Sequence, residues 1–367
     1  MEIWTSLVSP AESKDPRHIV ERAKDIETDG WSGAIYPDSQ VMSPEAFTLL
    51  ACCASVTERL KLGTGTSNPA TRHPSAIASA VATIQIVSGG RMTLSIGRGD
   101  SSLAYVGVPP VPLAYFERAL VALQDYLGGD PVSTKTAARF LGDLDRGFEQ
   151  LAVAEVPETS QMRWMPGDYI KPEVEATASG PKVIAIAARH ADRLSFAVGA
   201  DISRLKWAIA AARAEVERVG RDPETLSFGA YLPCFPHSDL GLARELASGQ
   251  VASMSRFSAM HRTVNGPMTD RDRENVARVA ATYDMKRHGS AASEHARALD
   301  PEYIDRFGLV GDPQRCHDTM LEIRDLGIDR LILWTGGTEG KAGESYRTAV
   351  EELVLPILAL EHGPSVA

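Results

Sequence analysis

Two glycine-rich stretches hold the residues of this chain best able to bind and orient a ligand. The first, at 61–74, is KLGTGTSNPATRHP, and the second, at 93–101, is TLSIGRGDS. Each begins as a short apolar strand and then turns to glycine and small polar residues, so that Asp100 and Ser101 stand beside backbone amides. Glycine at a strand end leaves bare backbone against which a flat ligand can lie. The pattern predicts a binding site at two adjacent strand ends, with a solvated turn as the alternative.

Histidine is the side chain best suited to proton transfer near neutral pH, and the sequence contains nine histidines. None is spaced as His-x-His or His-x-x-x-His, so no metal site is predicted. His73 lies in the first glycine-rich stretch and His261 in a long insertion, and either could act as an acid or a base. A structural role is the more frequent one for an isolated histidine, and both interpretations stay open.

A candidate anion site lies near residue 180. The sequence ASGP at 178–181 ends one apolar run and precedes a helix that Pro181 can begin, while FAVG at 196–199 ends the next run. Free backbone amides and the helix dipole attract a negative group to such a helix start. Two adjacent strand ends could therefore hold one phosphate, although ordinary turn formation explains the same residues.

These stretches belong to a regular alternation of strands and helices. Apolar residues recur at helical spacing between 75 and 90, so 61–101 is typical of a parallel strand–helix–strand unit. The other strands are expected at 3–8, 33–36, 174–178, 194–198, 226–232 and 330–334. The other helices are expected at 17–29, 43–57 (capped by Ser43), 113–127, 181–191, 202–219 and 346–360, with further pieces at 256–264 and 271–285. Eight strands in this alternation predict a closed (β/α)8 barrel of the α/β class.

Two long connections interrupt the alternation, at about 130–172 and about 236–310. Loops of this length are uncommon in compact domains unless they serve as lids or binding walls. We therefore expect a single barrel domain over 1–367, with both insertions at the strand ends and the substrate walls supplied by them.

Composition and charge exclude several classes of partner. The chain has 38 Lys and Arg against 48 Asp and Glu, a formal net charge of −10, so neither nucleic acid nor an anionic membrane is an expected partner. The first residues lack a signal-peptide pattern and no apolar run is long enough to span a bilayer, so a cytoplasmic protein is expected. Cys52 and Cys53 lie in an apolar helical run, where both thiols are expected to be buried and inert.

Taken together, the motifs resemble the bacterial luciferase-like superfamily of flavin- and deazaflavin-dependent oxidoreductases, and in particular its methylenetetrahydromethanopterin reductase-like branch. The resemblance runs from residue 1 to about 360, and its most specific part is NPATRHP at 68–74. The other matching pieces are YPDSQ at 36–40, SGGR at 88–91, IGRGDS at 96–101, ASGP at 178–181 and AD at 191–192. The resemblance implies a TIM barrel with insertions that binds FMN or the deazaflavin coenzyme F420 at the carboxyl ends of its strands.

The resemblance also assigns individual residues by position. Gly65 and Thr66 correspond to a backbone bulge behind the flavin ring, with a cis peptide between them, and Ser179 and Gly180 correspond to a phosphate cradle. The expected cofactor-binding residues are Gly65, Thr66, Asn68, Gly97, Gly99, Asp100, Ser101, Ser179, Gly180, Ala197, Val198 and Gly199. The catalytic candidates are Asp38, Ser39 and His73, which are expected to face one cavity together with Asp100.

Two positions depart from the family pattern. Many relatives have histidine directly after the aspartate of the second strand, where this chain has Ser39, so the identity of the proton donor stays open. Some deazaflavin enzymes have lysine just past the turn after the sixth strand, where this chain has Ala200. This second difference weakens the choice of deazaflavin over FMN.

The implied function is that of an oxidoreductase that positions a reduced flavin or deazaflavin against a small organic substrate. We favour hydride transfer with F420, because the branch that the chain most resembles is a reductase branch. An FMN-dependent two-component monooxygenase that uses O2 is one alternative, and a flavin-binding barrel without turnover is another. The expected partners are a small-molecule substrate, a second copy of the chain in a homodimer, and a separate flavin or F420 reductase that supplies reduced cofactor.

Overall fold

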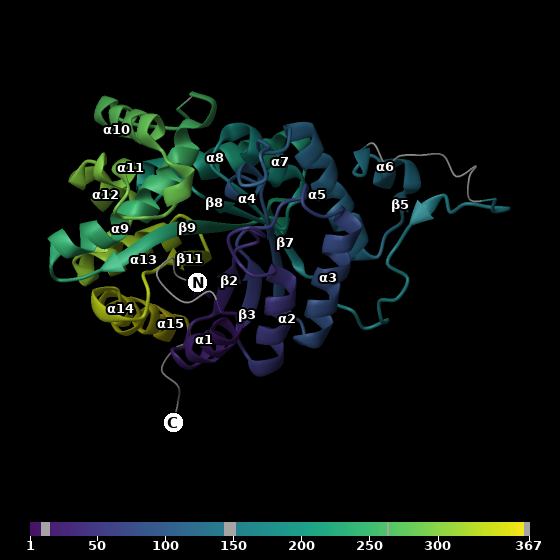
Figure 1. The fold of residues 1–367 in the computed structure, drawn as a ribbon, viewed down its shortest axis with the longest axis horizontal. Coiled ribbons are helices and arrows are strands. Elements are labelled where there is room, and N and C mark those ends of the chain that lie inside the picture. Colours follow the sequence, from purple (N-terminus) through teal and green to yellow (C-terminus); the bar gives the residue numbers. More distant parts are fainter. Residues whose placement is uncertain (9–14, 143–151, 263, 363–367) are drawn as a thin grey trace.

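The computed structural model describes residues 1–8, 15–142, 152–262 and 264–362, and its centre is a ring of parallel strands (Figure 1). In ring order these strands are β1 (Glu2–Ser6), β2 (Gly33–Tyr36), β3 (Lys61–Thr64), β4 (Met92–Ile96), β7 (Glu173–Ala178), β8 (Arg193–Phe196), β9 (Ser227–Pro236) and β11 (Arg330–Trp334). The parallel pairs β8–β9, β9–β11 and β11–β1 close the ring. The predicted (β/α)8 barrel is therefore confirmed.

Helices cover the outside of the ring (Figure 1). They are α1 (Pro16–Thr28), α2 (Ala46–Val56), α3 (Pro74–Val87), α5 (Leu113–Gly128), α7 (Pro181–His190), α8 (Ile202–Val219) and α13 (Pro313–Asp325). Local sequence sets several of their starts. The side chains of Asp15 and Asp201 accept backbone N–H bonds at the starts of α1 and α8, and proline is the first residue of α1, α3 and α7.

Four local features differ from the sequence expectations. Helix α2 begins at Ala46 and not at Ser43, because the carboxylate of Glu45 accepts the N–H of Thr48 at 2.6 Å and serves as the cap. Neither α13 nor the short strand β10 (Leu309–Gly311), which pairs with the end of β9, was expected. The expected closing helix consists of α14 (Gly340–Thr348), a π-helical segment (Ala349–Val354) and α15 (Leu355–His362).

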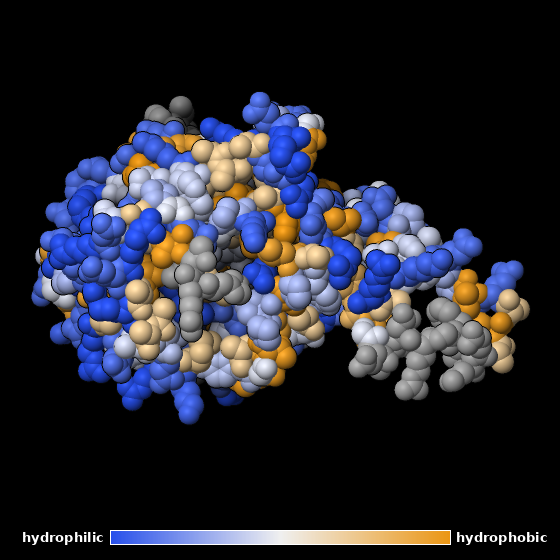
Figure 2. Space-filling view, turned by 90° about the horizontal axis from the view of Figure 1, so that it is seen from above, coloured by the Kyte–Doolittle hydropathy of each residue, from blue (hydrophilic) through white to orange (hydrophobic). Residues whose placement is uncertain are grey.

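The first insertion projects sideways from the barrel and does not cover its mouth (Figures 1 and 2). Its described part contains β5 (Val132–Ser133), α6 (Thr134–Ala138) and β6 (Thr159–Ser160). The insertion follows the end of α5, where the chain has returned to the amino ends of the strands, and it packs against the outer helices. Phe140 meets Tyr115 edge to face at 5.4 Å between ring centroids, and Gln85 donates to the carbonyl of Ile170 at 3.0 Å. The expectation that this segment supplies a lid or substrate wall is wrong for its described residues, because none of them lines the cavity.

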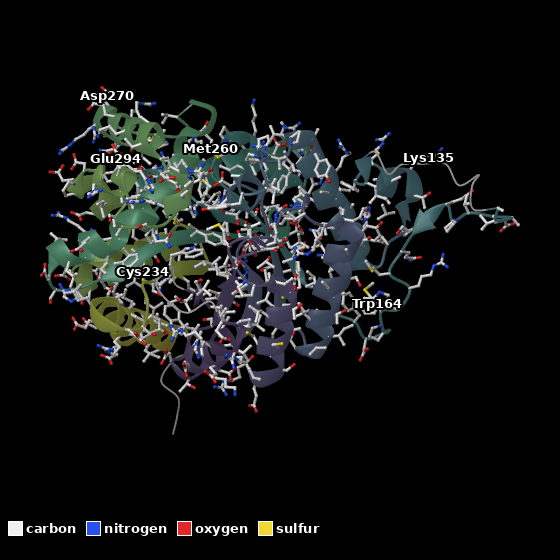
Figure 3. The ribbon with its side chains drawn as sticks, in the orientation of Figure 1. Lys135, Trp164, Cys234, Met260, Asp270 and Glu294 are labelled. Carbon is white, nitrogen blue, oxygen red and sulfur yellow. The ribbon has the colours of Figure 1, made fainter. Side chains whose placement is uncertain are left out.

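The second insertion lies on the opposite side of the molecule from the first, as the labels Met260, Asp270 and Glu294 show against Lys135 and Trp164 (Figure 3). It contains α9 (Leu240–Ser255), η4 (Arg256–Arg262), α10 (Asp270–Thr282), η5 (Met285–Arg287), α11 (Glu294–Arg297) and α12 (Pro301–Phe307). Its apolar residues form a core cluster with Trp4, Ile35 and Ile332 of the barrel strands. This shared core fixes the insertion to the barrel.

Two further expectations concern cysteines and membranes. Cys53 is buried as expected, whereas Cys52 is exposed, because it lies on the outer side of α2. Across the described ranges, no helix combines the length and the apolar character that crossing a bilayer requires.

Candidate active site

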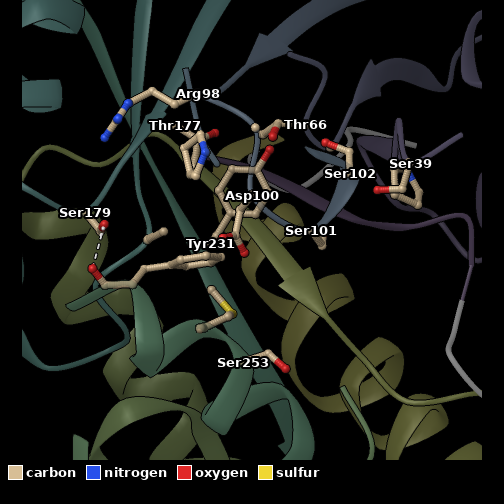
Figure 4. A pocket seen from close by; sticks show the side chains of 18 of the residues that line it. Ser39, Thr66, Arg98, Asp100, Ser101, Ser102, Thr177, Ser179, Tyr231 and Ser253 are labelled. Carbon is tan, nitrogen blue, oxygen red and sulfur yellow. Dashed lines mark hydrogen bonds between the residues drawn. The ribbon is translucent and has the colours of Figure 1, made fainter. Parts of the chain in front are cut away.

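A cavity of about 970 Å³ opens at the carboxyl ends of the barrel strands. One side is formed by residues that follow β2, β3, β4, β7 and β8. In Figure 4, Ser39 and Ser179 lie toward opposite sides of this lining, with Asp100 and Tyr231 between them. The other side comes from the second insertion, through Gln250, Ser253, Met254, Phe257, Met260, Asn265, Lys286, His288 and Gly289. The cavity thus lies at the strand ends where the sequence analysis expects a binding site, and residues of 236–310 form one of its sides.

The peptide bond between Gly65 and Thr66 is cis, as the resemblance predicts, and both residues line the cavity. Only glycine fits at position 65, because a Cβ atom there would lie 2.2 Å from Cδ1 of Ile35. Gly97 lies beside this bulge, since its own Cβ would be 3.3 Å from Oγ1 of Thr66. The two strand ends therefore present a surface of backbone that a flat ring can face.

The loop after β4 is tied to the second insertion. Gly99 has a φ of +76°, a conformation that favours glycine, and it leads into Asp100 and the short helix α4 (Ser101–Ala104). Asp100 and Ser101 line the cavity as expected. The carboxylate of Asp100 forms an ion pair with Arg256 at the start of η4. This pair joins the two sides of the cavity.

The structure separates the two candidates that follow β2. Ser39 lines the cavity, but Asp38 does not, and the side chain of Asp38 is only 1% exposed. Oδ2 of Asp38 accepts hydrogen bonds from Nη1 of Arg72 at 2.7 Å and from the hydroxyl of Ser67 at 2.6 Å. The expectation that Asp38 faces the cavity is not met, because its carboxylate points to the loop after β3.

Asn68 occupies a similar buried position behind the lining. Its Oδ1 accepts the N–H groups of Ala70 and Thr71, both at 3.1 Å, and its Nδ2 donates to the hydroxyl of Ser102 at 3.2 Å. Asn68 does not line the cavity. Its contacts shape the loop after β3 and attach that loop to α4.

His73 also lies outside the cavity lining, so the expectation that it faces the cavity is not met. It is the N-cap of α3, where its Nδ1 accepts the N–H of Ser75 at 3.1 Å. Its Nε2 lies 2.9 Å from the carbonyl oxygen of Ala137 in α6. Both ring nitrogens therefore contact protein groups, and the residue links the barrel to the first insertion. The side chain of His261 lies outside the described part of the structure.

The predicted phosphate cradle is partly exposed to the cavity. Ser179, Gly180 and Ala197 line the cavity, while Val198 and Gly199 lie behind them. Gly180 directly precedes α7, where unpaired backbone amides and the helix dipole favour an anion. The Nε of the buried Arg204 donates to the carbonyl of Val198 at 3.0 Å and holds this turn.

Two residues beside this helix start were not in the expected set. Lys182, which carries a positive charge, and Asn265 both line the cavity. Nδ2 of Asn265 lies 3.5 Å from the point where a Cβ atom on Gly180 would be. Lys182 follows the ASGP motif directly and could have been assigned from it. Asn265 comes from the second insertion, and no motif marks it.

The floor of the cavity contains a buried polar network. The Tyr231 hydroxyl donates to Oε1 of Glu175 at 3.3 Å and lies 3.1 Å from the hydroxyl of Ser95, and Glu175 accepts from Arg330 at 3.2 Å. Burial, followed by the charge of Glu175, raises the pKa of Tyr231 well above its ordinary value. The floor therefore presents a neutral phenol to a ligand.

The insertion side carries a hydrogen-bonded pair that the sequence analysis did not assign. The Tyr283 hydroxyl lies 2.6 Å from Nδ1 of His288, and His288 lines the cavity. Burial, followed by the nearby charge of Arg256, lowers the pKa of His288 to about 4. Its neighbours in sequence give no sign of this contact, which depends on how the insertion folds.

The part of the chain that the structure describes contains no candidate metal site. No group of three or more His, Cys, Asp or Glu side chains in these residues is arranged to hold an ion. The described lining residues offer backbone, hydroxyls, amides and apolar side chains, together with a few separate charged or titratable groups such as Asp100, Lys182 and His288. This donor set suits an organic ligand.

Comparison with known proteins agrees with this barrel and its strand-end cavity. The profile of the family described as "Luciferase-like monooxygenase" matches residues 2–330. The chain belongs to this family, and the predicted resemblance is confirmed. It is 23% identical to the 5,10-methylenetetrahydromethanopterin reductase of Methanolobus tindarius over 318 residues, which cover 86% of this chain and 89% of the relative. The predicted oxidoreductase class is confirmed with it.

Two solved structures share the fold. The coenzyme F420-dependent tetrahydromethanopterin reductase from Methanopyrus kandleri superposes with a TM-score of 0.69 at 20% identity, covering 97% of this chain and 99% of the other. An F420-dependent secondary alcohol dehydrogenase, solved with an F420–acetone adduct, superposes with a TM-score of 0.68 at 17% identity, covering 96% and 98%. At these identities the likeness establishes the shared barrel architecture.

Proposed function

We propose that the protein transfers hydride between coenzyme F420 and a small organic substrate bound in the strand-end cavity. The proposal rests on one observation. The Gly65–Thr66 bulge and the start of α7 line the same cavity. A flat ring and an anionic group of one ligand find suitable surfaces there. The proposal includes a single barrel domain and a homodimer.

The chain's residues fit a deazaflavin. The backbone surface at Gly65, Thr66 and Gly97 has no bulky side chain and suits the ring system. Ser179, Lys182 and Asn265 surround the helix start with a hydroxyl, a positive charge and an amide, which suit a phosphate. When bound, the deazaflavin supplies the two-electron hydride chemistry, and the protein supplies position and electrostatics.

The names of the similar proteins support the deazaflavin. The relative from Methanolobus tindarius and the two solved structures named above are reductases or dehydrogenases. The two solved structures are described as F420-dependent. Ser39 lines the cavity where many relatives have histidine, so we propose that Ser39 orients the ligand and that another residue handles the proton.

The second candidate function is an FMN-dependent monooxygenase that receives reduced flavin from a separate reductase. Ala200 favours it, because this buried residue stands where some deazaflavin enzymes have lysine. The family description, which names a monooxygenase, favours it as well.

Reoxidation of reduced cofactor distinguishes the two functions. The purified protein is mixed with reduced F420 or reduced FMN, with and without O2, and absorbance is followed. The deazaflavin proposal predicts binding of F420 and no acceleration of its reoxidation by O2. Rapid, protein-dependent consumption of O2 with reduced FMN would favour the monooxygenase. Binding of either cofactor without turnover of any substrate would leave a flavin-binding barrel, and binding of neither would contradict both enzymes.

A further inference from the structure

The second insertion forms one wall of the cavity, and Ser253 belongs to this wall. The hydrogen bonds around Ser253 show where the hydroxyl proton of Tyr283 points. The Ser253 hydroxyl donates to the carbonyl of Gly249 at 2.9 Å, so its only proton is used. Its oxygen accepts the N–H of Gly289 at 3.0 Å. The Tyr283 hydroxyl, 3.1 Å from the same oxygen, must therefore be the donor in that contact.

The tautomer of His288 follows from this count. Tyr283 has one hydroxyl proton, which it gives to Ser253, so its oxygen can only accept from Nδ1 of His288 at 2.6 Å. Burial raises the pKa of Tyr283, which keeps the phenol protonated. A neutral imidazole with its hydrogen on Nδ1 has a free electron pair on Nε2.

The surroundings of His288 keep the imidazole neutral. Burial is the largest cause of its low pKa, the positive charge of Arg256 acts in the same direction, and the Asp100 carboxylate opposes it. Asp100 is ion-paired with Arg256, and the guanidinium of Arg256 also lies 4.6 Å from the centre of the Tyr283 ring. Nε2 has no hydrogen-bond partner among the residues that the structure describes, and the residue lines the cavity.

We propose that His288 is the proton acceptor of this enzyme, and that its substrates are apolar primary or secondary alcohols, or the corresponding carbonyl compounds in the reverse direction. The inference rests on the proposed deazaflavin function. In the oxidation direction, the hydroxyl proton moves to Nε2, the carbinol C–H bond gives its hydrogen and electron pair to the oxidised deazaflavin as hydride, and a C=O bond forms. In the reduction direction, Nε2–H returns the proton to the carbonyl oxygen.

The neighbouring wall supports this substrate class. Met254, Phe257, Met260 and Trp334 also line the cavity, so the body of the substrate meets apolar side chains while one polar group meets Nε2. Ser39 has no group that accepts a proton at neutral pH, and Asp38 and His73 do not line the cavity. Tyr283 acts as a positioning residue, because it fixes the tautomer and does not itself need to touch the substrate.

The tautomer can be measured without turnover. Nitrogen NMR of the histidine-labelled protein, in the presence and absence of oxidised F420, should show His288 with a protonated Nδ1 and an unprotonated Nε2 at pH 7. Tyr283→Phe should produce a mixture of tautomers, because the acceptor for Nδ1–H is removed. A hydrogen on Nε2 in the unmodified protein would overturn the proposal, even if the cofactor binds.

Turnover gives the second test. His288→Asn keeps a donor toward Tyr283 and removes the acceptor at Nε2, so F420 affinity should stay within about twofold while alcohol oxidation falls by roughly 10²–10⁴-fold. Tyr283→Phe should lose a smaller part of the rate and should change its pH profile. Full activity of His288→Asn, or a protein that binds F420 and oxidises none of a panel of apolar alcohols, would overturn the proposal. Absence of F420 binding in the unmodified protein would instead contradict the proposed function.

Discussion

Nη1 of Arg72 lies 2.7 Å from Oδ2 of Asp38, while Nη2 of the same guanidinium lies 2.6 Å from Oε1 of Glu45. Arg72 therefore connects the end of β2, the start of α2 and the loop after β3. Asp38 is buried in this arrangement and also accepts from Ser67. We infer that Asp38 supports the loop that carries the Gly65–Thr66 bulge and takes no part in proton transfer.

Removing one partner of this ion pair should cost more than removing both. Arg72→Leu leaves the buried carboxylate of Asp38 without its counter-charge and should lower the free energy of unfolding by roughly 3–5 kcal/mol. The double variant Asp38→Asn/Arg72→Leu should be more stable than Arg72→Leu. Urea denaturation of the two single variants and the double variant measures the coupling. Strictly additive losses would show that the pair contributes no interaction energy.

His73 should be dispensable for chemistry and needed for the attachment of the first insertion. His73→Asn keeps an N-cap for α3 but loses the contact with Ala137, whereas His73→Ala loses both and should be about 1 kcal/mol less stable. Both variants should be cleaved faster within 130–172 in limited proteolysis. Their affinity for F420 should equal that of the unmodified protein. A loss of cofactor affinity in both variants would show that His73 contributes to the binding site.

The low pKa of His288 predicts a particular loss of stability in acid. The pKa is about 4 in the folded protein and 6.5 ordinarily, so between these values the unfolded chain binds a proton that the folded protein does not. Stability from this residue is therefore present above pH 6.5 and is lost as the pH falls toward 4, by up to about 1.4 kcal/mol per pH unit. His288→Asn should remove this component from the slope of unfolding free energy against pH. Identical slopes in the two proteins would mean that His288 titrates normally.

The bulge at Gly65 should tolerate no side chain. Gly65→Ala would place a Cβ 2.2 Å from Cδ1 of Ile35, and overpacking of this kind costs roughly 1–3 kcal/mol. The shift of the backbone should also weaken F420 binding. Ile35→Ala in the same chain should restore part of both losses, because it removes Cδ1 and Cγ1, at 2.2 and 2.9 Å, and leaves only the Cβ of residue 35, at 2.8 Å. Equal behaviour of Gly65→Ala and Gly65→Ala/Ile35→Ala would show that contact with Ile35 is not the reason for glycine.

Much of the barrel could be predicted because its strands are short apolar runs separated by amphipathic helices. The strand ends and the start of α7 followed from local motifs, whereas the position of the Gly65–Thr66 bulge followed from the resemblance to the luciferase-like superfamily. The capping of α2 could not be predicted, because serine is a preferred N-cap residue and glutamate is not, yet Glu45 caps the helix. Ser43 instead donates to the carbonyls of Pro37 and Ser39, at 3.3 and 3.2 Å.

Local sequence patterns could not predict which residues of the second insertion form the wall of the cavity. The wall contains contacts between residues far apart in the chain, such as Asp100 with Arg256, and the tautomer of His288 depends on Ser253 and Gly249 in α9. The direction of the first insertion was also hidden, since its length alone does not show at which end of the barrel it leaves. In both cases the missing information is which distant segments pack together.

The central claim, that the cavity binds a deazaflavin with its phosphate at the start of α7, is tested most directly by titrating oxidised F420 into two variants at position 180. A side chain fits there, because the nearest atom to a Cβ is Nδ2 of Asn265 at 3.5 Å and the backbone is extended. Gly180→Asn serves as the neutral control for Gly180→Asp, which places a negative charge beside the phosphate. Fluorescence titration should show saturable binding to the unmodified protein, a similar affinity for Gly180→Asn and an affinity at least roughly tenfold lower for Gly180→Asp. Equal affinities for all three proteins would contradict the account.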